Sequence, residues 1–329
     1  MKYGLGAWAN LALFEVVLIT KLARLYFGTQ RTRIQFMRYL LKIRGIWRIY
    51  GPFGAFQELA IRRSCWSLEN AEPGANKTKT SISDSTTYVR VCELAVADPL
   101  IFSKFRRCLE YRLILEHVTV RFGKKYLKIA LQNSMALDFF AQIKLQNNVG
   151  NPVTFHFKTI GRTSPTSIRY LKVLCQLIEL FGPLDDMRIS EIGVGFGGQA
   201  HAIVANQNLK SYTLYDLPPV LDLTKKFLKN LADISNLKFI DGRNPEPTKS
   251  NLVISNYAFS ELTRELQTMY LDKVISNAEM GYITWNELSY KELDGYSVSE
   301  ILSLIPSSKI LPEVPLTYPN NVIIVWGTK

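Results

Sequence analysis

The chain has 329 residues, of which 47% are hydrophobic, so it can bury a full core as one large domain with additions. No internal repeat is visible, which excludes the solenoid and propeller architectures. The formal net charge of +12 suits an anionic partner such as a lipid surface or phosphate groups. The four cysteines lack the paired spacing of a metal site and are typical of free thiols in a reducing cytoplasm: Cys65, Cys92, Cys108 and Cys175.

Most of the excess positive charge lies in residues 1–63, which hold nine of the twelve excess charges. The mostly apolar stretch 4–20 ends at Lys21, short of the ~20 residues that span a bilayer. No small-residue cleavage site stands out, so a signal peptide is not expected. Helices expected at 7–27 and 30–48 carry aromatic residues among Arg and Lys, which suits an interfacial anchor on anionic lipid. The alternative is a helical pair that packs on the core or on a second subunit.

Composition divides the chain into four expected segments. They are a basic helical N-terminal extension at 1–68, a polar linker or loop at 69–87, an acceptor-side or lid domain at 88–164, and a cofactor-binding domain at 165–329. In the third segment we expect helices near 88–113 and strand-rich patches around 117–131 and 152–160.

The most informative feature is the glycine-rich string MRISEIGVGFGGQ at 187–199, which is typical of a strand, a tight turn and a helix. Glycines let the backbone pass close to a ligand and adopt dihedral angles that a Cβ disfavours. A second strand, SYTLYD, ends at Asp216, where a carboxylate can accept both hydroxyl groups of a ribose. This arrangement predicts a site for an adenosine-bearing cofactor.

Two cofactor classes compete for this loop. Gly193, Gly195 and Gly198 satisfy the dinucleotide pattern G-x-G-x-x-G. Glu191, however, makes the string Glu-x-Gly-x-Gly-x-Gly, which resembles the first motif of class I S-adenosylmethionine methyltransferases. An acid there suits an ammonium group and would repel a pyrophosphate. The loop also leaves only about 140 residues, too few for two mononucleotide halves and a catalytic domain. We therefore expect S-adenosylmethionine rather than a nicotinamide cofactor.

Strands and helices alternate after the loop, which predicts a parallel sheet covered on both faces. The expected elements are a helix at 199–208, a strand at 211–215, a helix from 218 to about 231, strands at 237–240 and 251–255, a helix at 260–277, a strand at 281–285, a helix at 297–305, and closing strands at 309–314 and 321–326. The fold class is therefore α/β: a Rossmann-like class I methyltransferase sheet of seven strands, the last antiparallel, with mostly helical N-terminal additions.

Several strings together resemble a family of bacterial sugar O-methyltransferases of the surface-polysaccharide type. They are EIGVGFGGQA, YDLPPVL, LVISNYAFSEL at 252–262 and GYITWN at 281–286, and the similarity extends back through ILEHV, NNVGNP and SPTSIRYL to cover roughly 88–329. SNYAFSEL is the most specific of them. The resemblance implies methyl transfer from S-adenosylmethionine to a sugar hydroxyl.

The cofactor residues we expect are Glu191, Gly193, Gly195, Gly197, Asp216, Leu217, Asp241 and Asn256. Glu191 would accept the ammonium group, or it is a solvated acid at a strand end. Asp216 would bind the ribose diol. Leu217 would cover the adenine face, or belong to the core. Asp241 would meet the adenine amine, or begin an Asp-Gly turn.

A sugar hydroxyl needs a base within hydrogen-bond reach to become a good nucleophile. His117, Glu261 and Asn256 are the catalytic candidates, with Asn256 as a hydrogen-bond donor to the cofactor or the sugar. His117 qualifies if its segment covers the site, and otherwise is structural. Glu261 is a base, orients one, or caps the next helix. His201 fits helix packing better, and His156 the polar face of a strand. Dependence on a divalent metal stays open, but the sequence has no His-x-x-His or tight Asp pair, so no metal site is predicted.

The expected protein is a cytoplasmic methyltransferase, or one bound peripherally to the inner membrane face through residues 1–63. Its partners would be a glycan or another sugar-containing acceptor, and the possibility of a homo-oligomer stays open. The functional alternatives are an RNA methyltransferase, in which the basic arm binds phosphates, and a non-catalytic adenosyl-binding scaffold. The string SNYAFSEL lacks the Asn-Pro-Pro-Tyr type of motif that amino-methylating nucleic-acid enzymes carry, so nucleic acid is the less expected partner.

Overall fold

The computed structural model describes residues 61, 64–68, 86–287 and 293–329. The chain divides into two compact units, Met1–Ser64 and Cys65–Lys329, and the second contains the sheet and the glycine loop. The expected N-terminal helices, the proposed membrane anchor and most of the polar linker lie outside the described residues.

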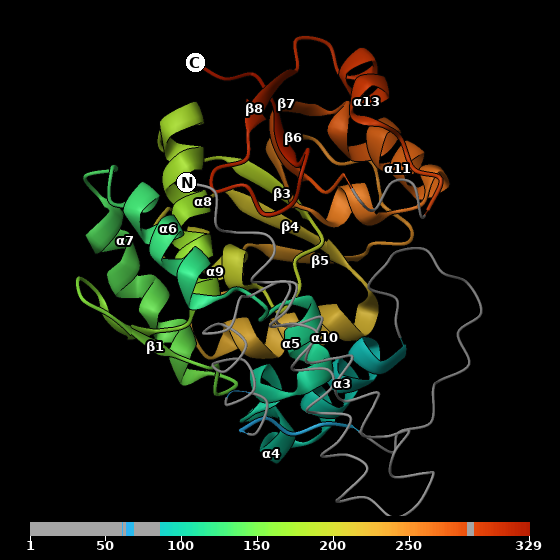
Figure 1. The fold of residues 1–329 in the computed structure, drawn as a ribbon. Helices are drawn as coiled ribbons and strands as arrows, with labels where there is room; N and C mark the ends of the chain where they lie inside the picture. Colours follow the sequence, from blue (N-terminus) through green and yellow to red (C-terminus); the bar gives the residue numbers. More distant parts are fainter. Residues whose placement is uncertain (1–60, 62–63, 69–85, 288–292) are drawn as a thin grey trace, which may run out of the picture. The chain divides into compact units, whose positions relative to one another are not determined.

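Seven strands form one sheet in the order β5-β4-β3-β6-β7-β9-β8 (Figure 1). Their bounds are β3 Arg188–Ile192, β4 Ser211–Asp216, β5 Leu237–Asp241, β6 Ser250–Asn256, β7 Ala278–Trp285, β8 Lys309–Pro312 and β9 Val322–Trp326. Strands β3 to β7 pair in parallel, and β9 runs antiparallel to both β7 and β8. This is the Rossmann-like class I methyltransferase sheet, and the predicted fold class is confirmed.

Helices cover both faces of the sheet. Two separate clusters of buried apolar side chains lie between the sheet and these helices. The helices of this part are α8 Pro165–Phe181, α9 Gly198–Val204, α10 Pro218–Lys229, α11 Arg264–Tyr270 and α13 Val298–Leu304. Ser164 caps α8 by accepting a hydrogen bond from the Thr166 N–H, and Gly182, at φ +87°, ends it. One cluster holds side chains of α8, α9 and α10, and the other holds side chains of α11 and α13.

The predicted helix at 260–277 is divided in the structure. A 3₁₀ turn at Ala258–Glu261 comes first, α11 follows, and a π-helical turn at Leu271–Ile275 ends the segment. Thr263 has an extended backbone (ψ 155°) and so interrupts the helical path before α11. The spacing of apolar residues predicted helical structure in this segment correctly, but spacing alone does not show where the helix is interrupted.

Residues 86–164, which precede α8, are mostly helical. They form α3 Thr86–Ala97, α4 Pro99–Phe102, α5 Leu109–Ile114, α6 Val120–Ala130 and α7 Ala136–Ile143, with 3₁₀ turns at Phe105–Arg107 and Lys144–Asn148. A short antiparallel ribbon, β1 Phe155–Phe157 and β2 Gly161–Thr163, precedes α8. Helix α3 packs on α10, while α6 and α7 pack on α8 (Figure 1).

The predicted strand-rich patch at 117–131 is wrong, because this segment contains helix α6. Thr119 caps the helix by accepting a hydrogen bond from the Phe122 N–H. Tyr126, Leu127 and Ala130 are buried and share one face at helical spacing. The β-branched and aromatic residues of the segment therefore do not make a strand here, since packing against α8 overrides their weak β preference.

The connection from β5 to β6 contains no helix, and all of its residues are described. A hollow therefore lies on that side of the sheet, lined by Arg188–Ser190, Ser211, Thr213, Lys238, Ile240 and Glu246–Ser250. It lies largely toward the amino ends of β3, β4 and β6, away from the glycine loop. Within the described residues, no helix is both long enough and apolar enough to cross a membrane.

Candidate cofactor and acceptor site

Three alternating glycines make the turn after β3. Gly193, Gly195 and Gly197 have φ values of +78°, +56° and +85°, a region that residues with a Cβ seldom adopt. A Cβ on Gly193 would lie 2.0 Å from the Cβ of Ala258, so the loop passes directly against the chain that follows β6. Gly198 begins α9 and has no such φ. The left-handed positions thus follow the spacing Gly193-Gly195-Gly197.

Asp216 lies at the carboxyl end of β4 and faces this loop. Its Oδ2 accepts a hydrogen bond from the Gly195 N–H at 2.9 Å, and its Oδ1 accepts one from the Leu217 N–H at 2.8 Å. Each carboxylate oxygen can accept more than one hydrogen bond, so the side chain is oriented and still has acceptor capacity. Leu217 stands immediately before α10 and is half-buried against the core.

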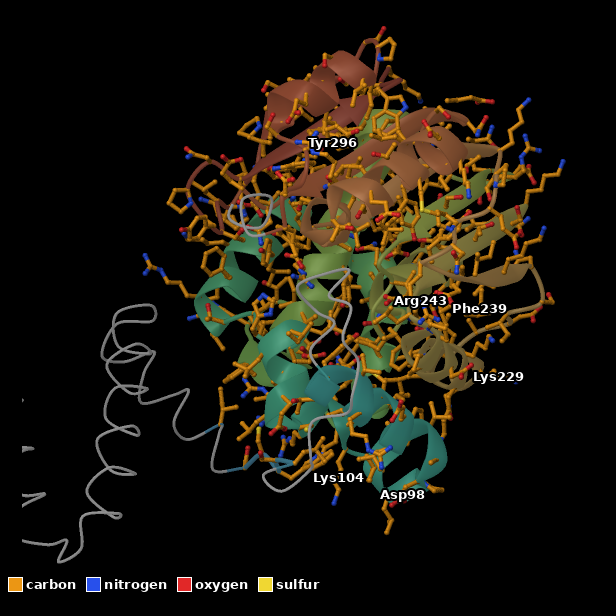
Figure 2. All side chains as sticks on the ribbon, turned by 90° about the vertical axis from the view of Figure 1, so that its right-hand side faces the viewer. Asp98, Lys104, Lys229, Phe239, Arg243 and Tyr296 are labelled. Carbon is orange, nitrogen blue, oxygen red and sulfur yellow. The ribbon has the colours of Figure 1, made fainter. Side chains whose placement is uncertain are left out.

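Asp241 ends β5 and stands opposite Asp216 in the strand register. Its carboxylate accepts hydrogen bonds from the backbone N–H and from the guanidinium of Arg243. Arg243 lies just after β5, the strand that contains Phe239 (Figure 2). These bonds, first of all the one from the Arg243 side chain, hold the pKa of Asp241 below its ordinary value. The structure thus shows the expected Asp-Gly turn, while the contact with an adenine amine stays a prediction.

Glu191 is buried in the middle of the sheet rather than solvated. Its Oε2 accepts a hydrogen bond from the Tyr212 hydroxyl at 2.6 Å. Burial raises the pKa of Glu191 to about 8, and the charge of Asp216 adds to this rise. The alternative of a solvated strand-end acid is therefore wrong. Contact with an ammonium group stays a prediction, and it would require this carboxyl to lose its proton.

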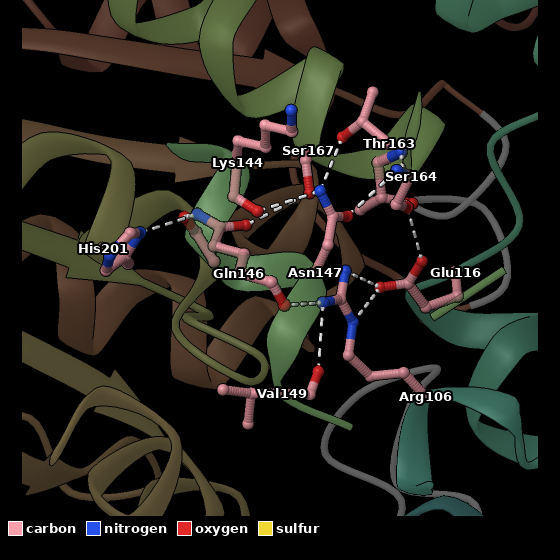
Figure 3. A network of polar contacts seen from close by, with 12 residues as sticks. Arg106, Glu116, Lys144, Gln146, Asn147, Val149, Thr163, Ser164, Ser167 and His201 are labelled. Atoms are coloured by element: carbon pink, nitrogen blue, oxygen red, sulfur yellow. Dashed lines mark hydrogen bonds and ion pairs between the residues drawn. The ribbon is translucent and has the colours of Figure 1, made fainter. Parts of the chain in front are cut away.

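A buried polar network supports the glycine loop from the N-terminal helices (Figure 3). Arg106 is fully buried, pairs with Glu116 and donates a hydrogen bond to the Gln146 carbonyl at 2.7 Å. Its guanidinium lies 4.5 Å from the ring centroid of Phe196, which is part of the loop. The Gln146 side chain in turn donates to the Gly198 carbonyl at 2.7 Å. The acceptor-side segment and the loop are therefore held together by specific contacts.

Helix α3 approaches the site from the side of Asp216. Burial, and to a smaller extent the Asp216 carboxylate, raises the pKa of both Tyr88 and Cys92 on this helix. Lys226 of α10 donates hydrogen bonds to the carbonyls of Ala95 and Val96 at the end of α3. No sequence motif marked α3 as part of the site, because its residues are ordinary core types at helical spacing.

Asn256 is the last residue of β6, and Glu261 ends the 3₁₀ turn that follows this strand. The amide nitrogen of Asn256 is buried and makes no hydrogen bond within the described part of the chain. An unpaired buried donor is costly, so this nitrogen suits a ligand atom. Glu261 accepts a hydrogen bond from the Asn286 amide at 3.0 Å. Burial raises its pKa, while Asn286 and the charge of Arg169 act in the opposite direction.

His117 lies near the same group of side chains. The residue is exposed at the surface. Desolvation by the surrounding protein, followed by the charge of Arg169, lowers the pKa of its imidazole. We name Arg169, His117, Asn256, Tyr257 and Glu261 the acceptor-side cluster. Arg169 joins the cluster because its charge acts on His117, Tyr257 and Glu261. Arg169 and Tyr257 were missed individually, although each stands inside a string of the family resemblance, SPTSIRYL or SNYAFSEL.

The other two histidines lie elsewhere. His201 is fully buried in α9, where burial lowers its pKa to about 4, and its Nδ1 lies 3.1 Å from the Gln146 amide nitrogen. This agrees with the expected packing role. His156 is exposed on β1, opposite Arg162, and fits the expected polar face of a strand. Among the described residues, no cluster of three or more His, Cys, Asp or Glu side chains could hold a metal ion.

Comparison with known proteins gives distant structural likenesses only. No family model matches the chain, and no curated protein matches it. Among solved structures, it is similar to the mitomycin 7-O-methyltransferase MmcR, at 14% identity and a TM-score of 0.35 over 45% of this chain and 49% of that one. The chain thus spans about half the length of that protein.

Two further structures are similar at the same level. The pyocyanin biosynthetic protein PhzM shares 11% identity over 49% of this chain and 57% of its own, with a TM-score of 0.35. PH1948 of Pyrococcus horikoshii, an RNA methyltransferase candidate, shares 12% identity over 49% of this chain and 82% of its own, with a TM-score of 0.34. Likenesses this distant carry no argument about activity, and the fold class rests on the strand order of the sheet.

The buried carboxyl of Glu191 predicts a pH-dependent stability. Its pKa is raised from 4.5 to about 8 in the folded protein. The protonated carboxyl therefore contributes its full share to the free energy of unfolding below pH 4.5, and this contribution is lost as the pH rises toward 8. Each unit of pKa shift corresponds to about 1.4 kcal/mol. Chemical denaturation at pH 5 and at pH 9 should therefore show that Glu191→Gln gains stability over the parent protein at pH 9 only. An equal difference at both pH values would contradict this placement.

The buried ion pair of Arg106 and Glu116 predicts a large loss of folding stability when one partner is removed. Arg106→Met leaves Glu116 buried without its cation and should cost about 3–5 kcal/mol in the free energy of unfolding. Arg90→Met is the matched control, because it removes an exposed Arg–Glu pair and should cost less than about 1 kcal/mol. The double variant Arg106→Met/Glu116→Gln should recover part of the loss. Equal losses for Arg106→Met and Arg90→Met would show that the network contributes little.

Proposed function

We propose that the protein transfers a methyl group from S-adenosylmethionine to a hydroxyl of a sugar, on a surface glycan or its precursor. The observation that carries the proposal is the pairing of the Gly193-Gly195-Gly197 turn with the Asp216 carboxylate through the Gly195 N–H. The sugar acceptor derives from the family resemblance and the location at the inner membrane face from the basic residues 1–63, and both are part of the proposal.

The residues present fit an adenosyl cofactor. A Cβ at Gly193 would clash with Ala258, so glycine is required where the turn passes the chain that follows β6. Asp216 has acceptor capacity for a ribose diol, and the buried Asn256 amide lacks a partner among the described residues. When bound, the cofactor supplies a methyl group already activated by the sulfonium.

The task of the chain is then to align the acceptor and remove its proton. Proximity and orientation alone contribute on the order of 7–11 kcal/mol to such displacements. Glu261 is the stronger candidate for the base, because burial raises its pKa toward the working pH. The Glu261 carboxylate would take the proton of the sugar hydroxyl as that oxygen accepts the methyl group, with the carbon–sulfur bond breaking and S-adenosylhomocysteine as the leaving group. His117 is the second candidate, though its lowered pKa makes it a weaker base.

An RNA substrate is the second candidate, favoured by the net charge of +12. Phosphate binding by basic side chains predicts an affinity that falls steeply with salt. RNA binding that persists at physiological salt and leads to methylation of the RNA would replace the sugar acceptor. A non-catalytic scaffold would bind the cofactor and methylate neither substrate.

Calorimetric titration with S-adenosylhomocysteine, with NAD in a parallel cell, tests the cofactor. We expect micromolar binding of S-adenosylhomocysteine and none of NAD. Asp216→Ala should weaken this binding by at least about tenfold, because a charge-assisted hydrogen bond contributes about 1.5–3 kcal/mol. Asp222→Ala, which removes an exposed carboxylate of α10, is the matched control and should bind as the parent does. Binding of NAD, or unchanged affinity in Asp216→Ala, would overturn the assignment.

The base is tested by the pH dependence of methyl transfer at saturating cofactor. The parent protein should lose turnover as the pH falls through the raised pKa of Glu261, because the carboxyl becomes protonated. Glu261→Gln should lower turnover by about 10²–10⁴-fold and remove that limb of the profile. Glu265→Gln changes an exposed carboxyl of α11 and should behave as the parent does. If Glu261→Gln retains the parent profile, His117→Ala becomes the decisive variant.

A further inference from the structure

Arg169 lies between the glycine loop and the residues that follow β6. Its guanidinium lies 5.5 Å from the ring centroid of Tyr170 and 5.9 Å from that of Tyr257. The Tyr170 ring packs against Gly198, where an added Cβ would lie 2.2 Å from it, and Tyr257 directly follows Asn256. The cation is thus placed next to the predicted cofactor turn and among the candidates for acceptor chemistry.

The guanidinium has no ion-pair partner within residues 61, 64–68, 86–287 and 293–329, whereas Arg106, Arg243 and Arg264 each have one there. The two acids on the same side have other partners. Glu313 accepts hydrogen bonds from the Tyr257 hydroxyl and from Thr317, and Glu261 accepts one from Asn286. The neighbouring rings are those of neutral tyrosines.

Arg169 nevertheless stays charged. Burial opposes its charge, but a guanidinium keeps its proton throughout the physiological pH range. Its side chain is only partly buried, so a ligand can reach it. A guanidinium presents a planar fork of donors that matches a carboxylate or a phosphate with two parallel hydrogen bonds. A neutral hexose offers no such group.

We propose that the acceptor carries an anionic group, a carboxylate or a phosphate, and that Arg169 binds it between the rings of Tyr170 and Tyr257. The inference rests on the proposed function, because it takes the acceptor-side cluster as the place where the sugar binds. It narrows the substrate class to acidic sugars, which are either uronates or sugars that carry a phosphate.

The test is calorimetric binding to the full chain saturated with S-adenosylhomocysteine. The probes are 4-nitrophenyl glucuronide for the carboxylate, glucose 1-phosphate for the phosphate, and 4-nitrophenyl glucoside as the neutral counterpart. At least one anionic probe should bind ten times more tightly than the glucoside, and which one does so identifies the source of the negative charge.

Three variants separate recognition from folding. Arg169→Gln should abolish the preference for the anion, and Arg169→Lys should keep part of it, because the charge remains but the fork is lost. Arg162→Gln, at an exposed arginine of β2, should keep the full preference. Unchanged binding of S-adenosylhomocysteine shows that each variant is folded.

Equal binding of the three probes, no binding of either anion, or a preference that survives in Arg169→Gln would each overturn the inference. Failure of the parent protein to bind S-adenosylhomocysteine would instead overturn the proposed function. The two failures are therefore distinguishable in one experiment.

Discussion

The hydrogen bond from the Gly195 N–H to the Asp216 carboxylate joins the carboxyl ends of two neighbouring strands, and the geometry of the site depends on it. It requires the chain to leave β3 through three left-handed glycines, since only that path turns the Gly195 N–H toward β4. The same path brings Gly193 against Ala258, so the end of β6 is fixed relative to the turn. The turn after β3, the end of β4 and the chain that follows β6 are thereby held together at one edge of the sheet.

The N-terminal helices complete this arrangement. Arg106 reaches Phe196 of the turn, and Gln146 reaches the carbonyl of Gly198, so residues distant in the chain hold both sides of the loop. All members of this network are buried, and a buried cation that is ion-paired to Glu116 and donates hydrogen bonds to it and to backbone carbonyls has few alternative positions. Contacts from residues 88–164 therefore support the shape of the turn. This is a physical reason for the two parts to form one compact unit.

The sheet could be predicted from the sequence because its signals are local. Apolar runs bounded by turn residues marked β3 to β7, and proline at the start of α10 marked a helix. Helix α6 could not be predicted, since its β-branched and aromatic residues suit a strand until α8 provides a surface for one helical face. Asp216 was placed correctly at a strand end, whereas the burial of Glu191 depends on Tyr212 across the sheet. Arg169 was missed because its neighbours come from segments about ninety residues apart, and no spacing rule links them.

Burial and the charge of Arg169 together set the pKa values of the titratable groups in the site. Glu191 and Glu261 are both disfavoured as anions by burial, but only Glu261 lies within the influence of the Arg169 cation. Arg169 lowers the pKa of Glu261 and also that of His117, so it weakens both candidate bases while it has no anionic partner. An anion bound to Arg169 would offset this effect, because the pair is electrically neutral at a short distance. The pKa of Glu261 would then rise toward the working pH, which makes it a better base in the presence of the acceptor. In the proposed reaction, binding of an acidic sugar and removal of its hydroxyl proton would thus be coupled through the Arg169 guanidinium.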